Sequence, residues 1–213
     1  PKTMNTHLHL LEAYTNLLKT WDSDMLRGSL RKLLLIMLDR IIDHDTWSLN
    51  LFFAMDWSPC SNITSYGHNI EGSWLICEAA GILGDAELLK RTEACSLKMA
   101  ERVLKEGMDT VYGGIYNETK DSVLDDTKDW WPQAEAVVRF YNMYQVTGNT
   151  VFLDASLKAW EFIRNHIIDH VHGEWFSGVT RDGSRVTGDE KAGFWKCPYH
   201  NSRMCLEIIS RIK

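Results

Sequence analysis

The feature that most constrains the fold is a helix-hairpin pattern that recurs along the chain at nearly constant intervals. Polar or aromatic residues mark the start of every second expected helix, at Asn5, His68, Trp131 and His200. The intervals are 68 − 5 = 63, 131 − 68 = 63 and 200 − 131 = 69 residues. Such repeats are typical of arrays in which each helix pair packs on the next. The sequence therefore predicts an all-α toroid of helix hairpins with short β excursions.

Apolar residues spaced three and four apart predict the individual helices. The expected helices cover residues 2–20, 23–43, 67–83, 85–106, 130–146, 150–169 and 198–213. Alternating apolar residues over 47–57 indicate a strand or hairpin arm. Glycine-containing turns within 111–117 and 174–186 indicate short hairpins. The odd-numbered helices carry the unusual polar residues near their N-termini, so we expect them to line the inside of the toroid and the even-numbered helices to cover them.

The number of hairpins indicates that the toroid is incomplete. A toroid of this kind closes with six hairpins, and the pattern contains three and a half. We therefore expect residues 1–213 to form a single domain that is the C-terminal portion of an (α/α)6 barrel. Apolar edges left open by an incomplete ring would also favour self-association.

Composition excludes several classes of function. Lys and Arg number 23 and Asp and Glu 29, which gives a formal charge of 23 − 29 = −6. This acidic balance, with no basic cluster, argues against a nucleic-acid partner. No apolar run approaches the roughly 18 residues of a membrane span. The five cysteines include no Cys-x-x-Cys pair, which argues against a zinc framework and favours reduced thiols in a cytoplasmic protein.

Two histidines are the candidate acid–base residues. His68 and His200 each lie in the first turn of an expected inner helix, where the positive end of the helix dipole helps to keep an imidazole neutral, as a base must be. Glu71 lies three residues after His68 on the same helix face, where it can bind one ring nitrogen and fix the tautomer. His44, His166, His170 and His172 are interpreted as core or surface residues.

Further polar and aromatic residues near the same helix starts suit a sugar ligand. Asn5 and His9 are four residues apart and share one face of the first helix. Amide and carboxylate groups bind hydroxyls, and indole faces stack on the apolar faces of pyranose rings. These considerations single out as substrate-binding candidates Asn5, Trp131, Gln133, Glu135 and Trp195.

Other functions compete with this interpretation. An inverting glycoside hydrolase would need two carboxylates across a cleft, for example Glu71 with Glu135 or Asp126. Two histidines and a carboxylate are also a ligand set for iron or zinc, although nothing in the spacing demands a metal. A binding module without catalysis, or an inactive fragment, is the third alternative.

Four motifs in register resemble the N-acylglucosamine 2-epimerase superfamily, and most closely its cellobiose 2-epimerase branch. They are Met4-Asn5-Thr6-His7-Leu8-His9, Gly67-His68-Asn69-Ile70-Glu71, Trp130-Trp131-Pro132-Gln133-Ala134-Glu135 and Lys196-Cys197-Pro198-Tyr199-His200-Asn201. The resemblance implies an (α/α)6 barrel that epimerises C2 of the reducing-end glucose in a β-1,4-linked disaccharide such as cellobiose. It implies neither a metal nor an organic cofactor.

The resemblance also implies roles for individual residues. His68 and His200 would be the two acid/base histidines, and Glu71 would support His68. Asn5 and His9 would bind sugar hydroxyls, while Trp131 and Trp195 would stack on the sugar rings. An arginine that this family carries in the N-terminal half of its barrel has no counterpart here. The same superfamily leaves N-acylglucosamine epimerisation and mannose isomerisation open as alternatives.

Overall fold

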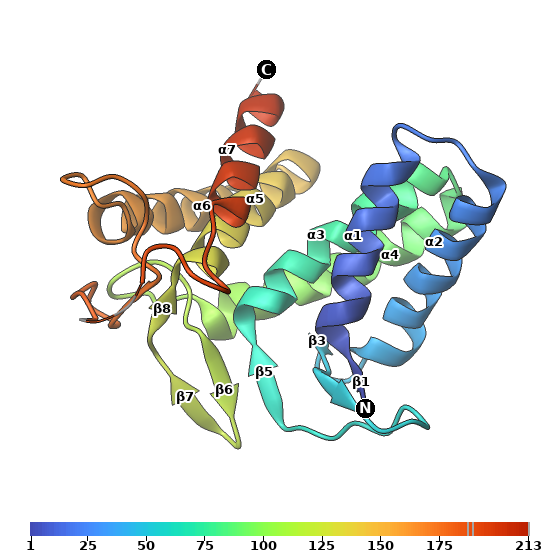
Figure 1. Cartoon of the computed structure of the whole chain (residues 1–213), viewed down its shortest axis with the longest axis horizontal. Helices are drawn as coiled ribbons and strands as arrows, with labels where there is room; N and C mark the ends of the chain where they lie inside the picture. The colour runs from blue at the N-terminus through green and yellow to red at the C-terminus, as the bar shows by residue number, and fades with distance from the viewer. Residues whose placement is uncertain (187, 189, 213) are drawn as a thin grey trace. The chain divides into compact units, whose positions relative to one another are not determined.

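The computed structural model describes residues 1–186, 188 and 190–212, and it divides into two compact units, Pro1–Arg102 and Val103–Lys213 (Figure 1). Both units are built of paired α-helices joined by loops that contain strands of two or three residues. The fold is therefore helical with short β excursions, as the apolar spacing predicts. That the two units belong to a single domain stays a prediction.

The first unit contains two helical hairpins. Its helices are α1 (Met4–Leu18), α2 (Asp24–Ile36), α3 (Tyr66–Leu83) and α4 (Ala86–Arg102). Helix α3 packs against the other three, so it lies at the centre of the unit. Side chains that are completely buried form its core, among them Leu8, Leu30, Leu34, Ile70, Ile76 and Met99. Ser23 accepts a hydrogen bond from Leu26 N and Asp85 accepts one from Leu88 N, so these two side chains cap α2 and α4.

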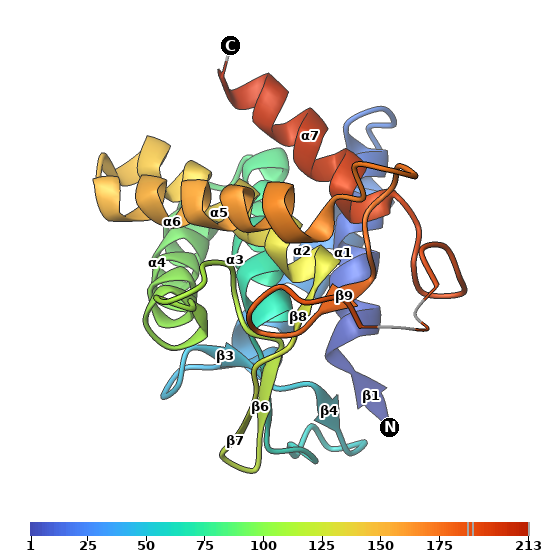
Figure 2. The same cartoon turned by 90° about the vertical axis from the view of Figure 1, so that its left-hand side faces the viewer.

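The second unit is centred on α5 (Trp130–Thr147). Helices α6 (Thr150–Phe162) and α7 (Tyr199–Ile212) both pack against α5 (Figure 2). Helix α5 ends where Gly148 adopts a left-handed conformation, φ 69°, which glycine reaches without a steric cost. The predicted boundaries of α5 and α7 are confirmed to within a few residues, whereas α6 ends at Phe162 and a π-helical turn follows it instead of further α-helix to residue 169.

The strands are two or three residues long and form antiparallel pairs. Antiparallel pairs join β1 (Lys2–Thr3) to β4 (Phe52–Phe53), β2 (Ile42–Asp43) to β3 (Ser48–Leu49), β6 (Glu118–Lys120) to β7 (Val123–Asp125) and β8 (Lys128–Asp129) to β9 (Gly178–Val179). Strand β5 (Ile63–Ser65) leads directly into α3. The strands thus tie the loops together at the beginnings of the inner helices.

Four details differ from the sequence prediction. Lys2–Thr3 is a strand and not the first turn of a helix. Residues 47–57 contribute to two different strand pairs instead of one arm. Residues 111–117 form a turn closed by the single bridge between Met108 and Ile115. The β6–β7 hairpin was not predicted, because Asp121 and Ser122 adopt positive φ at its turn where glycine or asparagine is usual.

A loop motif that occurs three times connects the helices. Short π-helical turns, η1 (Met37–Ile41), η2 (Val103–Gly107) and η3 (Ile163–Ile167), each precede an aspartate by two residues. The carboxylates of these aspartates, Asp43, Asp109 and Asp169, each accept hydrogen bonds from the backbone N–H groups two and three residues later. Each loop is therefore a folded turn with its backbone polar groups satisfied.

Side-chain amides at the start of the inner helices hold these loops in place. Asn69 Oδ1 accepts a hydrogen bond from Leu49 N at 2.8 Å. Gln133 Oε1 accepts one from Ile115 N at 2.7 Å, and Gln133 Nε2 donates to Ile115 O. In the third repeat Asn201 Nδ2 donates to Glu174 Oε1. The residues immediately before the first and third amides are His68 and His200, so the anchoring of the loops also fixes the candidate histidines.

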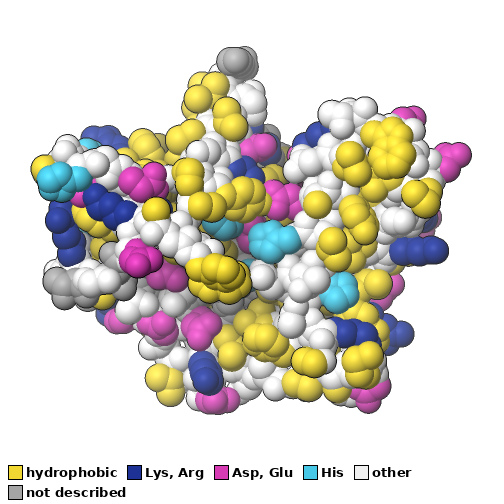
Figure 3. Space-filling view, viewed as in Figure 1, with side chains coloured by type: hydrophobic (Ala, Val, Ile, Leu, Met, Phe, Trp, Pro, Cys, Tyr) yellow, Lys and Arg dark blue, Asp and Glu magenta, His cyan; other side chains and the backbone are white. Residues whose placement is uncertain are grey.

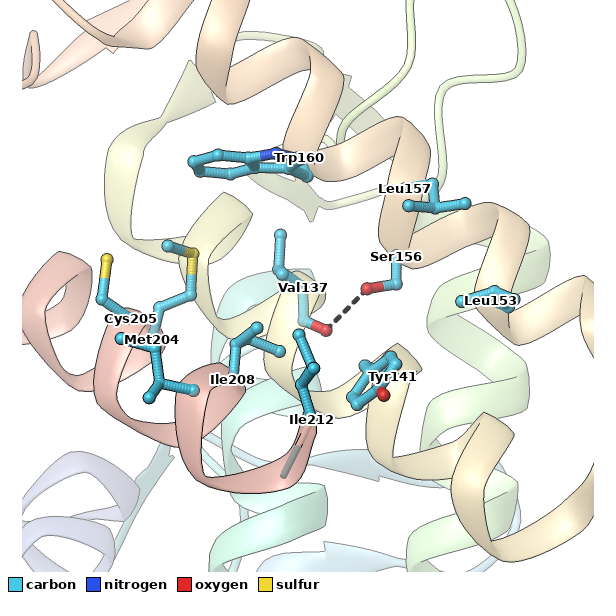
Figure 4. A pocket seen from close by; sticks show the side chains of 11 residues that line it. Val137, Tyr141, Leu153, Ser156, Leu157, Trp160, Met204, Cys205, Ile208 and Ile212 are labelled. Carbon is cyan, nitrogen blue, oxygen red and sulfur yellow. Dashed lines mark hydrogen bonds between the residues drawn. The ribbon is translucent and has the colours of Figure 1, made fainter.

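Helix α7 leaves an apolar groove open in the second unit. The groove lies among α5, α6 and α7, and Figure 4 shows Trp160, Met204 and Ile208 on its walls. Only Asn201 and Met204 of α7 are buried. Hydrophobic side chains therefore remain visible along α7 (Figure 3), with Leu206, Ile209 and Ile212 all more than half exposed.

Candidate functional site

His68 is held at the start of α3 by the residue that caps this helix. Ser65 precedes the helix in an extended conformation, and its Oγ lies 2.9 Å from His68 Nδ1. The imidazole is partly accessible, whereas Glu71, one turn further along, is 1% exposed. With Nδ1 engaged by a hydroxyl, Nε2 is the nitrogen of His68 that suits proton transfer to a ligand. The expected support of His68 by Glu71 stays a prediction.

Helix α1 adds two polar residues to the first unit. Asn5 is exposed in the first turn, and His9 follows one turn later with its side chain 41% exposed. His9 Nδ1 lies 3.4 Å from Glu12 Oε2, a carboxylate that the sequence interpretation did not include. His7, between them, instead bonds to the carbonyl of Thr3. The assignment of Asn5 and His9 to sugar binding stays a prediction.

The second unit pairs His200 with a buried carboxylate. His200 Nδ1 lies 2.8 Å from Glu135 Oε1, and the side chains are 16% and 1% exposed. Helix α7 supplies the imidazole in its first turn and α5 supplies the carboxylate, also within two turns of its start. An ionised Glu135 only accepts hydrogen bonds, so Nδ1 of His200 donates its proton to Glu135, and in the neutral imidazole the lone pair lies on Nε2.

Aromatic rings surround this imidazole. Ring centroids of Tyr199, Trp131 and Trp130 lie 4.6, 5.4 and 6.5 Å from that of His200. Trp131 is partly exposed and offers an indole face beside the histidine, as expected of a residue that stacks on a sugar. Trp195 is 82% exposed in the segment that leads to α7, where it contacts Phe194 edge to face.

Arg203 completes the polar contacts of Glu135. Its Nη2 donates to Glu135 Oε1 at 2.7 Å, and its side chain is only 12% exposed. Burial raises the pKa of Glu135, but the positive charge of Arg203 and the hydrogen bond from His200 outweigh burial and hold that pKa below its usual value. Glu135 is therefore an anion inside the unit at neutral pH.

Two expectations about α5 change with this geometry. Gln133 is completely buried, and its side-chain amide forms hydrogen bonds with the backbone N–H and carbonyl of Ile115. It therefore anchors a loop and is not placed to contact a sugar. Glu135 binds His200 and Arg203, a role closer to the one predicted for Glu71 than to hydroxyl binding. Arg203 and Tyr199 were missed, although Arg203 lies one helical turn after His200 and that spacing places both on one face.

The remaining side chains define what else the units can hold. In the second unit, Glu135 and His200 are two potential metal ligands within hydrogen-bond distance of each other. Among the helices of the described residues, none is both long and apolar enough to span a bilayer. The arrangement in each unit is thus a partly accessible imidazole at a helix start, beside sugar-compatible side chains.

Comparison with known proteins matches the chain to one family. The family described as N-acylglucosamine 2-epimerase (GlcNAc 2-epimerase) matches residues 1–203. A cellobiose 2-epimerase of Bacteroides fragilis is 46% identical over 209 residues, which are 98% of this chain and 53% of that protein. One of Ruminococcus albus is 41% identical and matches 99% of this chain and 54% of its own length.

Solved structures agree with these relatives. The crystal structure of a sugar epimerase from a ruminal bacterium superposes with a TM-score of 0.95 at 41% identity and covers 99% of this chain and 54% of its own. A D-mannose isomerase superposes with a TM-score of 0.83 at 20% identity, over 98% of this chain and 56% of its own, and shows the shared fold. The chain spans about half the length of the relatives it matches, a length that agrees with the expected C-terminal half of an (α/α)6 barrel.

Proposed function

The chain belongs to the N-acylglucosamine 2-epimerase family, and on that premise we propose that it supplies half of the active site of a sugar 2-epimerase. The substrate is a β-1,4-linked disaccharide with glucose at its reducing end, cellobiose being the first to test, and the product is glucosyl-mannose. Two cellobiose 2-epimerases that are 41–46% identical over nearly the whole chain favour this substrate.

The observation that carries the proposal is the contact between His200 Nδ1 and Glu135 Oε1 at 2.8 Å. Epimerisation at C2 needs a base that takes a carbon-bound proton next to a carbonyl. A carboxylate behind Nδ1 fixes the tautomer with the lone pair on Nε2, and it stabilises the imidazolium that forms when that lone pair takes a proton. The protein environment of His200 therefore suits both the uptake of a proton by Nε2 and the imidazolium that results.

The reaction uses His68 and His200 as partners. After the reducing sugar opens to its aldehyde, one imidazole removes the proton from C2, and the electron pair of that C–H bond moves to the carbonyl oxygen as an enediolate forms. The other imidazole then donates a proton to the opposite face of C2, the carbonyl is restored and the configuration is inverted. Neither imidazole alone reaches both faces of C2, which is why two are needed. No cofactor takes part, so chelators leave turnover unchanged.

Binding of the disaccharide is assigned to side chains at the helix starts. Asn5 and His9 bind hydroxyls, and their exposure on α1 supports this role. Trp131 and Trp195 stack on the sugar rings, for which their accessible indoles are suited. Glu71, deeply buried one turn after His68, supports that histidine.

The electrostatic environment of Glu135 disfavours this residue as the general acid of a hydrolase. An inverting hydrolase needs a protonated carboxyl with a raised pKa as its general acid. The pKa of Glu135 is held below its usual value by Arg203 and His200, even though burial raises it. Glu135 is thus a poor general acid.

The experiment is to incubate cellobiose with the 213-residue chain, and with a longer polypeptide that carries it, and to separate the sugars formed. Glucosyl-mannose is the expected product of the longer polypeptide, and both His68→Ala and His200→Ala abolish its formation without changing the circular dichroism. Mannose and N-acetylglucosamine are parallel substrates. If mannose or N-acetylglucosamine is turned over faster than cellobiose, the chain belongs to another branch of the family. Release of free glucose from cellobiose contradicts epimerisation.

We also propose a location and a self-association for the chain. The five cysteines are free thiols among the described residues, which supports a location in the reducing cytoplasm. The open apolar groove and the exposed side chains of α7 support self-association of the 213-residue chain. Light scattering tests the second property, and Ile209→Glu on the exposed side of α7 should reduce the average mass.

A further inference from the structure

Arg203 has more contacts than an ion pair requires. Its Nη2 donates to Glu135 Oε1 at 2.7 Å, and Nη1 donates to Tyr199 Oη at 2.5 Å. Its guanidinium carbon lies 4.5 Å from the centroid of the Tyr199 ring. The side chain is therefore fixed at both ends of its planar group, beside the helix turn that carries His200.

The same oxygen of Glu135 serves both partners. Oε1 lies 2.8 Å from His200 Nδ1 and 2.7 Å from Arg203 Nη2, while Arg203 Nη2 and His200 Nδ1 are 3.4 Å apart. A guanidinium only donates hydrogen bonds, so it cannot accept the Nδ1 proton itself. Through its bond to Oε1 it holds the carboxylate in the form and place in which the carboxylate accepts that proton.

A buried carboxyl without a neighbouring cation tends to become protonated. A protonated Glu135 would have an O–H to donate, and Nδ1 of His200, 2.8 Å from Oε1, could accept it. The imidazole would then carry its own proton on Nε2, the nitrogen that must be unprotonated to act as a base. The charge at position 203 therefore decides which nitrogen of His200 faces the substrate with a lone pair.

We propose that Arg203 is a positioning residue that keeps Glu135 as the hydrogen-bond acceptor of His200 Nδ1 and thereby presents His200 Nε2 as the base. The catalytic half of this statement rests on the proposed function, whereas the tautomer of His200 does not. A simple structural tether between α7 and α5 is the competing explanation, and it makes no demand on the tautomer.

The experiment follows the side-chain nitrogens of His200 by two-dimensional ¹H–¹⁵N NMR in the 213-residue chain. The variants are Arg203→Met, which removes the charge, and Arg203→Lys, which keeps it without the planar group. Arg211→Met is the matched control, because Arg211 lies on the same helix and pairs with Glu207 at 2.9 Å. The His200 resonance is assigned by its loss in His200→Ala.

The expected spectrum of the unaltered chain has His200 protonated on Nδ1. Arg203→Met moves the proton to Nε2, Arg203→Lys restores the Nδ1 form at least in part, and Arg211→Met changes nothing. In the longer polypeptide, Arg203→Met lowers kcat for cellobiose about 10–100-fold, the range found when outer partners of a functional imidazole are removed. KM stays within about twofold.

An unchanged His200 tautomer in a folded Arg203→Met variant would overturn the proposal, and so would an Nε2–H form in the unaltered chain. If circular dichroism shows that Arg203→Met does not fold, the same spectra are recorded for Arg203→Lys and Arg203→Gln. The proposal then predicts that His200 stays protonated on Nδ1 in Arg203→Lys and is protonated on Nε2 in Arg203→Gln. If no epimerase activity is found at all, the proposed function fails, while the tautomer still reports on Arg203.

Discussion

Helices α3 and α7 occupy the same place in two repeats, yet they differ sharply in how much of each is covered. His68 and His200 are 200 − 68 = 132 residues apart, and each is followed by an asparagine. Twelve of the eighteen residues of α3 are buried, against two of fourteen in α7. Helix α4 covers α3 in the first unit, whereas the groove beside α7 is open. The comparison shows that the candidate histidine is placed by the helix start and its loop, not by how deeply the helix is buried.

The two histidines also differ in what holds them. A neutral hydroxyl, Ser65 Oγ, lies against His68 Nδ1, and a charged carboxylate, Glu135, lies against His200 Nδ1. A hydroxyl accepts or donates as required, while an ionised carboxylate only accepts. His200 is thus the histidine whose tautomer its unit dictates, and we expect it to be the more sensitive to its partner.

The largest expected effect is the difference in kcat between substitutions of Glu135, the partner of His200, and Ser65, the partner of His68. Glu135→Gln removes the charge that stabilises an imidazolium at His200, so kcat for cellobiose should fall by about 100- to 10,000-fold. Ser65→Ala removes a helix cap worth about 1 kcal/mol and one hydrogen bond, and its kcat should fall by less than about 10-fold. Steady-state kinetics on the longer polypeptide measures both. Equal losses would mean that the partner of the imidazole does not matter.

A second contrast lies in the aspartate loops that precede α5 and α7. Asp109 and Lys128 form an ion pair with both side chains completely buried, whereas Lys191, which pairs with Asp169, is 30% exposed. Asp109→Asn leaves a buried ammonium without its counter-charge and should cost about 3–5 kcal/mol of unfolding free energy. Asp169→Asn should cost clearly less, because Lys191 can turn to water. Urea unfolding of both variants checks the order, and a larger loss for Asp169→Asn would refute this account of the loops.

A third comparison uses matched core positions on the two helices. Ile76 in α3 and Ile208 in α7 are also 132 residues apart, but Ile76 is completely buried and Ile208 only partly. Ile76→Ala should cost about 2–5 kcal/mol through lost burial and a residual cavity. Ile208→Ala should cost about 1 kcal/mol, since less surface is withdrawn from water. Equal costs in the 213-residue chain would indicate that the groove beside α7 is covered in solution.

The smallest effect concerns acid stability. Burial raises the pKa of Asp109, but hydrogen bonds from Arg181, Lys128 and two backbone N–H groups hold it well below its usual range. Because the folded-state pKa is the lower one, the resulting stability is fully present above the unfolded value of about 4 and is lost as pH falls further. Urea midpoints should therefore decline below about pH 4, and Asp109→Asn should flatten this decline. A decline of unchanged steepness in the variant would assign it to other carboxyls.

The helices could be predicted because burial on one face imposes their spacing on the sequence. The caps at Ser23 and Asp85 and the glycine that ends α5 followed from local backbone chemistry. The π-helical turns could not be predicted, since they continue the apolar pattern of the helix before them. The β6–β7 hairpin was missed because Asp121 and Ser122 carry none of the usual turn signals.

The sequence predicts which residues belong to the candidate site better than it predicts which residues they contact. His68 and His200 stand out because histidines at two helix starts share one repeat. The pairing of Glu135 with His200, and the loop-anchoring role of Gln133, depend on contacts between segments 65 and 18 residues apart. No local pattern separates a glutamine that bonds a backbone from one that bonds a sugar.

The most direct test of the central claim is the fate of the hydrogen at C2 when the longer polypeptide turns over cellobiose in deuterium oxide. Removal of that hydrogen by one imidazole and return from another, which exchanges its proton with solvent, predicts deuterium at C2 of the glucosyl-mannose formed. Product formed in full with hydrogen alone at C2 would contradict proton transfer through His68 and His200.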